Sequence, residues 1–132
     1  MVGVLIVTHG QLAQELVTSA EMIVGEVSHS ITPVSIGWHD DVNQVHDEIE
    51  RAIRAADQGQ GVLILTDMFG GTPSNIALSF LEKNRVEIVT GVNLPMVIKL
   101  ASQTEIKDLH SFAQAVCEQG RKNVTLASAL IK

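Results

Sequence analysis

The chain has 132 residues, of which 45% are hydrophobic and 18% charged, so its length and composition fit one globular domain with a core of its own. The formal net charge is −6 at pH 7 and the sequence pI is about 5.2, which argues against a nucleic-acid-binding surface, because neutralising phosphates requires clustered Lys and Arg. An acidic surface of this kind favours a basic protein partner.

Neither the start of the sequence nor its cysteine content points to secretion or to a membrane. The first residues run directly into an apolar segment with no basic region before it, and no apolar run reaches the ~20 residues that span a bilayer. The single cysteine, Cys117, follows Phe112, Ala113 and Val116 at helical spacing, which predicts a buried thiol. We therefore expect a cytoplasmic protein without a disulfide inside the chain.

The first element is the apolar run of residues 2–7, which stops at Thr8-His9-Gly10. Branched aliphatic residues without alternation predict a strand that is buried on both faces, as in parallel sheets covered by helices. In such sheets ligands bind beyond the carboxyl ends of the strands, especially where neighbouring connections leave in opposite directions. His9 is therefore the first candidate functional residue.

Two helices and an edge strand follow this first strand. Apolar residues at helical spacing from Leu12 predict a helix that ends at Gly25. Residues 30–36 predict a strand, and Pro33 places it at a sheet edge because proline cannot donate to a ladder. Residues 42–56 then form the clearest amphipathic helix of the chain.

The third strand repeats the design of the first. Residues 61–67 read GVLILTD, and residues 3–9 read GVLIVTH. If these strands lie side by side in the doubly wound order 2-1-3-4, their equivalent ends bring His9 and Asp67 together. A carboxylate beside an imidazole holds one N–H, fixes the tautomer and leaves the other ring nitrogen as a nucleophile or base.

The segment after Asp67 predicts a second helix start at the same crevice. Gly70 and Gly71 allow a tight loop, Thr72 is expected to cap the helix, and Pro73 takes its first position. The amino terminus of a helix offers unpaired backbone N–H groups to an anion. We expect the same of the helix that begins after His9-Gly10.

The rest of the chain completes the alternation of strands and helices. Residues 86–92 predict a fourth strand, a short helix starts near Pro95, and a last helix runs from Asp108 and is closed by Gly120. Residues 123–131 predict a fifth strand from their Val, Thr, Leu and Ile content.

These elements define the expected fold class. Residues 1–132 form a single-domain, three-layer α/β fold with a doubly wound, mostly parallel sheet of order 2-1-3-4. The C-terminal strand has no crossover helix after it, so it would join antiparallel or reach across to a neighbouring subunit. Exchange of this strand would make the protein a homodimer.

A histidine at the end of a strand is often only structural, and the matched Asp67 is what favours a functional role for His9. The sequence lacks the motifs HExxH, GxxxxGK[ST] and GxGxxG and has no cluster of cysteines, so we expect neither a metal nor a cofactor. The remaining histidines are expected on turns or polar helix faces: His29, His39, His46 and His110.

Four motifs stand out along the chain, namely IVTHG at residues 6–10, AEMIVGE at 20–26, LTDMFGGTPSNIA at 65–77 and GVNLPM at 91–96. In these motifs the sequence resembles the IIA components of the mannose-type phosphoenolpyruvate-dependent sugar phosphotransferase system. The resemblance implies that His9 accepts a phosphoryl group from the phosphocarrier HPr and passes it to a IIB component. It also implies that Asp67 orients His9.

Under this resemblance, Asp67 accepts the Nδ1 proton of His9 in a hydrogen bond, and Nε2 makes an in-line attack on the phosphohistidine of the donor. The developing negative charge is met by backbone N–H groups at two helix ends and by the Thr72 hydroxyl, without a metal. We expect the phosphoryl-binding residues to be Gly10, Gly71, Thr72 and Ser74.

The resemblance also implies partners. Some relatives continue into a IIB domain whereas this sequence ends at Lys132, so a separate IIB polypeptide is expected, and through it the membrane IIC and IID components.

Two alternatives keep the phosphorylation chemistry, namely a regulatory sensor in an incomplete phosphotransferase system and a dihydroxyacetone-kinase phosphotransfer subunit, which tends to carry serine where this chain has Gly10. A small tetrapyrrole chelatase would require a second histidine near His9.

Overall fold

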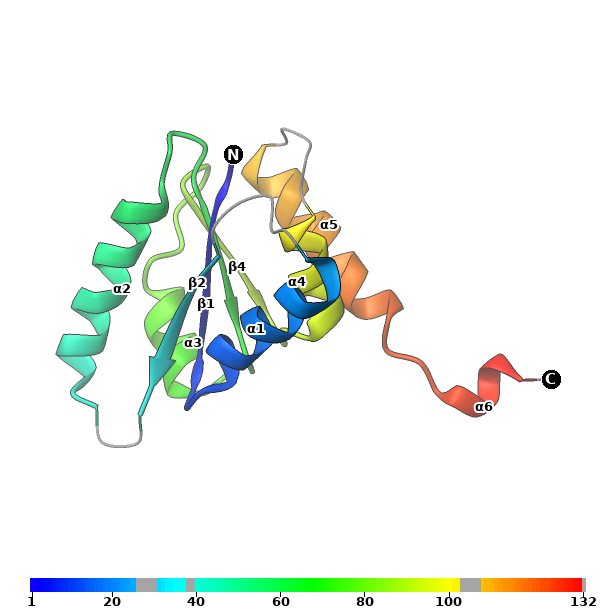
Figure 1. Cartoon of the computed structure of the whole chain (residues 1–132). Helices are drawn as coiled ribbons and strands as arrows, with labels where there is room; N and C mark the ends of the chain where they lie inside the picture. Colours follow the sequence, from blue (N-terminus) through cyan, green and yellow to red (C-terminus); the bar gives the residue numbers. More distant parts are fainter. Residues whose placement is uncertain (26–30, 38–39, 103–107, 132) are drawn as a thin grey trace.

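The computed structural model describes residues 1–25, 31–37, 40–102 and 108–131. The predictions for His29, His39 and the first residue of the second strand, Ser30, lie outside the described residues. Figure 1 shows the elements, which are β1 (Gly3–His9), α1 (Leu12–Val24), β2 (Ile31–Ile36), α2 (Val42–Ala56), β3 (Val62–Thr66), α3 (Thr72–Leu78), β4 (Val86–Thr90), α4 (Leu94–Ala101), α5 (Leu109–Lys122) and α6 (Ala127–Leu130).

The described strands form one parallel sheet in the order β2-β1-β3-β4, as the sequence predicts. β2, which contains Pro33, is an edge strand, and β4 forms the other edge. In the register of β1 with β3, Gly3 lies opposite Val62 and Val7 lies opposite Thr66. The two similar strand sequences are therefore adjacent but displaced by one residue.

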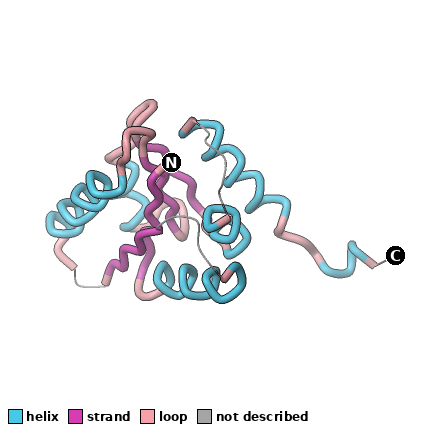
Figure 2. Tube along the Cα trace, turned by 45° about the horizontal axis from the view of Figure 1, so that its top comes forward, coloured by secondary structure: helices cyan, strands magenta, loops and turns pink. Residues whose placement is uncertain are grey.

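Helices cover both faces of the sheet, with α1, α4 and α5 on one side and α2 and α3 on the other (Figures 1 and 2). Val4 and Ile6 of β1 pack in the layer of α1, α4 and α5, whereas Leu5 and Val7 pack in the layer of α2 and α3. Both faces of β1 are thus buried, which explains the continuous apolar run in the sequence.

The chain leaves β1 and β3 toward opposite faces of the sheet. α1 follows β1 on one face, and α3 follows β3 on the other. The crevice beyond the carboxyl ends of β1 and β3 is therefore a switch point of the topology, the place where such sheets bind ligands. His9 and Asp67 lie there, at the ends of adjacent strands.

Several boundaries differ from the sequence prediction. α5 continues to Lys122, past Gly120, because Gly120 serves the packing rather than the helix end: a side chain there would run into Met96 of α4. β4 ends at Thr90 rather than at residue 92. Cys117 is partly rather than fully buried.

The prediction of a strand at residues 123–131 is wrong for the described chain. Residues 127–130 form the short helix α6, and this tail extends away from the body of the protein (Figures 1 and 2). A strand needs a neighbouring strand for its backbone N–H and C=O groups, and the extended tail has none beside it. A local hydrogen bond from the amide of Ala129 to the carbonyl of Leu126 forms instead.

Among the helices of the described ranges, none has the length and apolar character that crossing a bilayer requires.

The contact between β1 and the end of α2 yields a stability prediction. A Cβ at Gly3 would collide with the backbone carbonyl of Ala56, which cannot rotate away as a side chain can. Gly3→Ala should lower the free energy of unfolding by about 1–3 kcal/mol in urea denaturation. Gln44→Ala on the exposed face of α2 is the control and should change it by less than about 0.5 kcal/mol. Equal stability of both variants would contradict this packing.

Candidate active site

The carboxylate of Asp67 contacts both the backbone amide and the imidazole ring of His9. Asp67 Oδ2 accepts a hydrogen bond from the His9 backbone amide at 3.0 Å and lies 2.7 Å from His9 Nδ1. The other carboxylate oxygen, Oδ1, accepts from the backbone amide of Met68 at 2.9 Å. The predicted proximity of His9 and Asp67 at the two strand ends is therefore confirmed.

The electrostatics of the pair define the tautomer of the ring. Partial burial of Asp67 acts to raise its pKa, but the hydrogen bonds from the His9 amide and ring outweigh burial and hold the pKa below its ordinary value. Asp67 is thus ionised at neutral pH and only accepts hydrogen bonds. Because Oδ2 accepts at Nδ1, that nitrogen carries the proton of a neutral His9 ring, and Nε2 keeps a free lone pair.

The strand register explains how one carboxylate reaches two groups. Val7 lies opposite Thr66, so the chain continuing from β3 brings Asp67 beside Thr8, one residue before His9. From this position Asp67 Oδ2 reaches the backbone amide of His9, the next residue along β1, and also the His9 ring. The side chain of Asp67 is only 13% exposed, whereas that of His9 is 47% exposed. The carboxylate is shielded while the imidazole ring stays open to solvent.

The exposed ring borders a cavity of about 240 Å³ at the carboxyl ends of β1 and β2. Gly71 lies directly against the ring: a Cβ at this position would be 2.8 Å from His9 Cε1. A larger residue at position 71 would therefore displace the imidazole. The cavity is lined by His9, Gly10, Ile36, Gly37, Asp40, Val42, Val45 and Thr72.

The helices that begin beside His9 and Asp67 lack side-chain caps, unlike the other helices that pack on the described sheet. Asp41, Asn93 and Asp108 cap α2, α4 and α5 by accepting from backbone amides of the first turn. α1 and α3 begin after Gln11 and Gly71, and neither cap residue makes a side-chain cap bond. Apart from the Ala13 amide, which donates to the Thr8 hydroxyl, their first-turn N–H groups receive no side-chain acceptor in the described chain.

The start of α1 is the stronger of these two donor sites. Within the described chain, the amides of Gln11 and Leu12 have no hydrogen-bond partner, and α1 continues for 13 residues. α3 has only seven residues, so its aligned peptide dipoles contribute less. An anion held near His9 would be met mainly by the α1 amides.

The residues expected to bind a phosphoryl group are placed unequally. Gly10 makes the turn from β1 to α1 with φ of 54°, a conformation that favours glycine, and lines the cavity with Thr72. Thr72 does not cap α3 as predicted; Gly71 is the cap residue and Thr72 begins the helix. Ser74 is fully buried and its hydroxyl has no hydrogen-bond partner in the described chain, so its contact with a phosphoryl group stays a prediction.

Two features of the site were missed at the level of sequence. The buried hydroxyl of Thr8 accepts a hydrogen bond from the backbone amide of Ala13 at 2.8 Å and so connects β1 to the first turn of α1. The only sequence signal for this role is the Thr that precedes both His9 and Asp67. Asp40, which lines the cavity, accepts a hydrogen bond from the Gly37 amide at 2.7 Å.

The other described histidines lie on helix surfaces. His46 on α2 stacks on Phe80, with ring centroids 4.5 Å apart, and its potential ligand atom lies within 4.8 Å of those of Asp47 and Glu50. Exposed acidic groups of this kind are common without a bound metal ion, and Glu50 is already paired with Arg54. His110, on α5, is 69% exposed and lies 3.7 Å from Glu87.

Comparison with known proteins identifies the family. The family model described as "PTS system fructose IIA component", EIIA-man, matches residues 3–117, which include both His9 and Asp67. The chain belongs to this family. IIA components act as phosphotransferases in the phosphoryl relay of the phosphotransferase system (PTS), and this chain is a mannose-family IIA component of sugar phosphotransfer.

Individual relatives agree with this assignment. The chain is 33% identical over 123 residues to the PTS system fructose-specific EIIA component of Bacillus subtilis (strain 168), covering 90% of this chain and 84% of the relative. It is 31% identical over 135 residues to the PTS system mannose-specific EIIAB component of Escherichia coli (strain K12), covering 97% of this chain. The matched part is 40% of that longer relative.

Solved structures show the same fold. A mannose/sorbose-specific IIA subunit from Enterococcus faecalis matches with a TM-score of 0.83 and 28% identity, covering 96% of this chain and 95% of the other. A PTS IIA protein associated with the fucose utilization operon of Streptococcus pneumoniae matches with a TM-score of 0.84 and 27% identity, covering 98% and 96%. The architecture of the described chain is that of PTS IIA proteins.

The contact between Asp67 and His9 yields a pH prediction. Because the folded-state pKa of Asp67 is lowered, its contribution to stability is present above about pH 4 and is lost as the pH falls through the folded-state pKa. The free energy of unfolding of the wild type should exceed that of Asp67→Asn by about 1–3 kcal/mol at pH 7. This difference should shrink in urea denaturation as the buffer is taken toward pH 3.

Asp47→Asn is the matched control, because Asp47 also lies beside a histidine, at 3.8 Å from His46 Nδ1, but is 67% exposed. Its effect on stability should stay small, under about 1 kcal/mol, at every pH. A wild-type advantage over Asp67→Asn that stays constant or grows toward acid pH would contradict the role given to Asp67.

Proposed function

We propose that this IIA component accepts a phosphoryl group from phospho-HPr on Nε2 of His9 and passes it to a IIB component. The observation that carries the proposal is the 2.7 Å contact between His9 Nδ1 and Asp67, which leaves Nε2 with its lone pair. The family assignment supports the same role. Through IIB, the phosphoryl group would reach a sugar at the membrane IIC and IID components.

The transfer balances without a cofactor. The Nε2 lone pair of His9 attacks the phosphorus of the donor phosphohistidine, the new P–N bond forms as the donor P–N bond breaks, and the donor imidazole leaves with the electron pair. The His9 ring gains positive character during this step. Its Nδ1–H stays hydrogen-bonded to the Asp67 carboxylate, which offsets that charge.

The phosphoryl oxygens need donors near Nε2 while the group is transferred. The unpaired amides of Gln11 and Leu12 at the start of α1 suit this role, and the Thr72 side chain lines the same cavity as His9. The half-exposed His9 ring suits a donor and an acceptor that are both proteins, because neither can enter a closed pocket. Hand-off to IIB is the reverse of acceptance, with His9 as the leaving group.

We also propose that the protein is a homodimer in which the apolar tail of one copy covers the β4 edge of the other. Val124, Leu126, Leu130 and Ile131 are each 73% to 79% exposed, an unusual state for four large apolar residues in one short segment. In the described part of the chain no strand pairs with the outer edge of β4.

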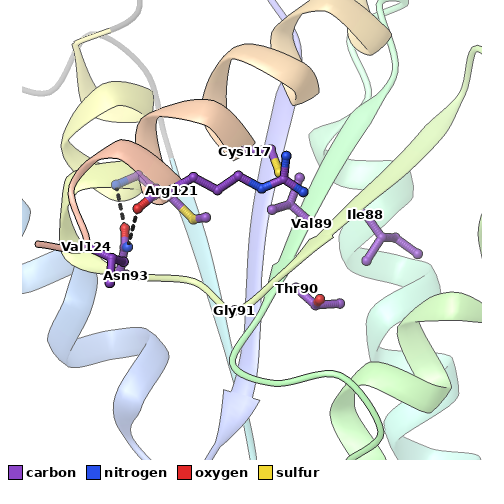
Figure 3. Close-up of a pocket in the computed structure, with 10 residues that line it drawn as sticks. Ile88, Val89, Thr90, Gly91, Asn93, Cys117, Arg121 and Val124 are labelled. Atoms are coloured by element: carbon purple, nitrogen blue, oxygen red, sulfur yellow. Dashed lines mark hydrogen bonds between the residues drawn. The ribbon is translucent and has the colours of Figure 1, made fainter.

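A pocket of about 380 Å³ lies beside this edge and suits such a contact (Figure 3). Ile88, Val89 and Thr90 of β4 line it together with Cys117 and Arg121 of α5, whose guanidinium-bearing side chain extends across the pocket. Asn93 closes one end, where it donates to the Gly120 carbonyl and accepts from the Met96 amide. A second copy is the proposed occupant because its tail supplies apolar side chains that this copy leaves uncovered.

Phosphorylation by purified partners tests the main proposal. Incubation with phosphoenolpyruvate, enzyme I and HPr should place one acid-labile phosphoryl group on the protein, and His9→Ala should remove it, because among the histidines that the structure describes only His9 has an orienting carboxylate at the sheet crevice. His110→Ala is the matched control, since it removes an exposed histidine beside a carboxylate. Peptide mapping at alkaline pH locates the label. Undiminished labelling of His9→Ala would refute the assignment.

Removal of residues 123–132 tests the dimer. We expect sedimentation to shift toward the monomer and the melting temperature to fall by several degrees, because apolar contacts between copies are lost. Met22→Ser serves as a control, since Met22 is equally exposed but lies on α1. A truncated protein that sediments and melts like the full chain would place the interface elsewhere or nowhere.

A further inference from the structure

The turn between β1 and α1 is held at two points. On one side the Gly10 amide donates to the carbonyl of Ile36 in β2, at 2.9 Å. On the other side the Ala13 amide donates to the hydroxyl of Thr8, at 2.8 Å, and both of these residues are fully buried. Between the two anchors lie Gln11 and Leu12, whose amides have no hydrogen-bond partner in the described chain.

The hydroxyl of Thr8 replaces an ordinary helix cap. The cap residue of α1, Gln11, makes no side-chain cap bond, so the first turn is anchored from the strand below it rather than from the chain just before it. A cap side chain at Gln11 would accept from the amide of Ala13 or Gln14. The Thr8 hydroxyl accepts from the Ala13 amide in its place and so holds the turn from β1, while the Gln11 and Leu12 amides stay without a partner in the described chain.

A second buried threonine, Thr66, has an equivalent position in the chain but does not make this bond. Thr66 stands before Asp67 as Thr8 stands before His9, and Thr66 is equally buried, but its hydroxyl has no hydrogen-bond partner. Thr8 bonds to the second residue of the following helix, Ala13; the second residue of α3 is Pro73, which has no amide hydrogen. The bond at Thr8 is therefore a specific feature of the helix that starts beside the nucleophile.

We propose that Thr8 is a positioning residue for phosphoryl transfer: its buried hydroxyl fixes the start of α1 so that the amides of Gln11 and Leu12 point at the phosphoryl oxygens on His9. This inference rests on the function proposed above. Thr8 touches neither the phosphoryl group nor the partner, so it acts through the geometry of the turn. Displacement of such donors by about 1 Å is enough to slow a transfer step substantially.

Three variants test the proposal. Thr8→Val keeps the shape of the side chain but leaves the Ala13 amide without an acceptor, and it should lower the maximal rate of His9 phosphorylation about tenfold or more with little change in KM for phospho-HPr. Thr8→Ser restores the hydroxyl and should restore most of the rate. Thr66→Val removes a buried hydroxyl that has no partner and should transfer at within about twofold of the wild-type rate.

The outcomes separate a positioning role from a general packing effect. A Thr8→Val rate equal to wild type would overturn the proposal, and so would equal losses in Thr8→Val and Thr66→Val. Loss in Thr8→Val without rescue by Thr8→Ser would also overturn it, because the hydroxyl would then be irrelevant. If the wild type itself takes no label, the proposed function fails, whereas the role of Thr8 is still decided by the following measurement.

Amide NMR of the wild-type protein tests the geometry without any transfer reaction and without a variant that has to fold. Titration with inorganic phosphate should shift the Gln11 and Leu12 amide resonances downfield, and the Ala13 amide should be protected from hydrogen exchange relative to both. The Gln11 and Leu12 shifts should weaken in Thr8→Val if that variant folds. Unshifted Gln11 and Leu12 resonances, or an Ala13 amide that exchanges as fast as they do, would overturn the proposal.

Discussion

A single carboxylate oxygen organises the proposed active site of this protein. Oδ2 of Asp67 receives both the backbone amide and the ring nitrogen Nδ1 of His9, so one atom fixes the end of β1 and the orientation of the imidazole. The second oxygen is held by the Met68 amide, which prevents the carboxylate from turning away. Because these bonds keep Asp67 ionised, the proton of the neutral ring is held at Nδ1, and the lone pair that we propose as the nucleophile is held at Nε2.

That contact depends on features spread over the whole fold. β1 and β3 must be neighbours, and their register must be displaced by one residue so that Asp67 lies beside the residue before His9. The helices that follow the two strands must leave toward opposite faces, which opens the crevice in which the ring is exposed. The absence of side-chain caps on α1 and α3 within the described chain then leaves backbone donors at the same crevice.

The sequence predicts the sheet and the central pair well, because both follow from strong local signals. The apolar runs of β1 and β3 require burial on both faces, and their similar ends place His9 next to Asp67 once the strands are adjacent. The sequence predicts less about side chains whose role depends on distances between elements. Thr72 was expected to cap α3, yet the loop places the cap at Gly71. The burial of Ser74 could not be read from the sequence either, and its contact with a phosphoryl group stays a prediction. The strand prediction for the C-terminal residues was wrong for a related reason, since residues with high strand propensity form a strand only when another strand lies beside them.

The most direct test of this account is nitrogen-15 NMR of the His9 imidazole, before and after phosphorylation. The account predicts that in the unphosphorylated protein with a neutral ring the proton is on Nδ1, as the contact to Asp67 requires. It further predicts that phosphorylation shifts the Nε2 resonance and couples it to phosphorus. A ring protonated on Nε2, or a phosphoryl group found on Nδ1, would contradict the central role of Asp67.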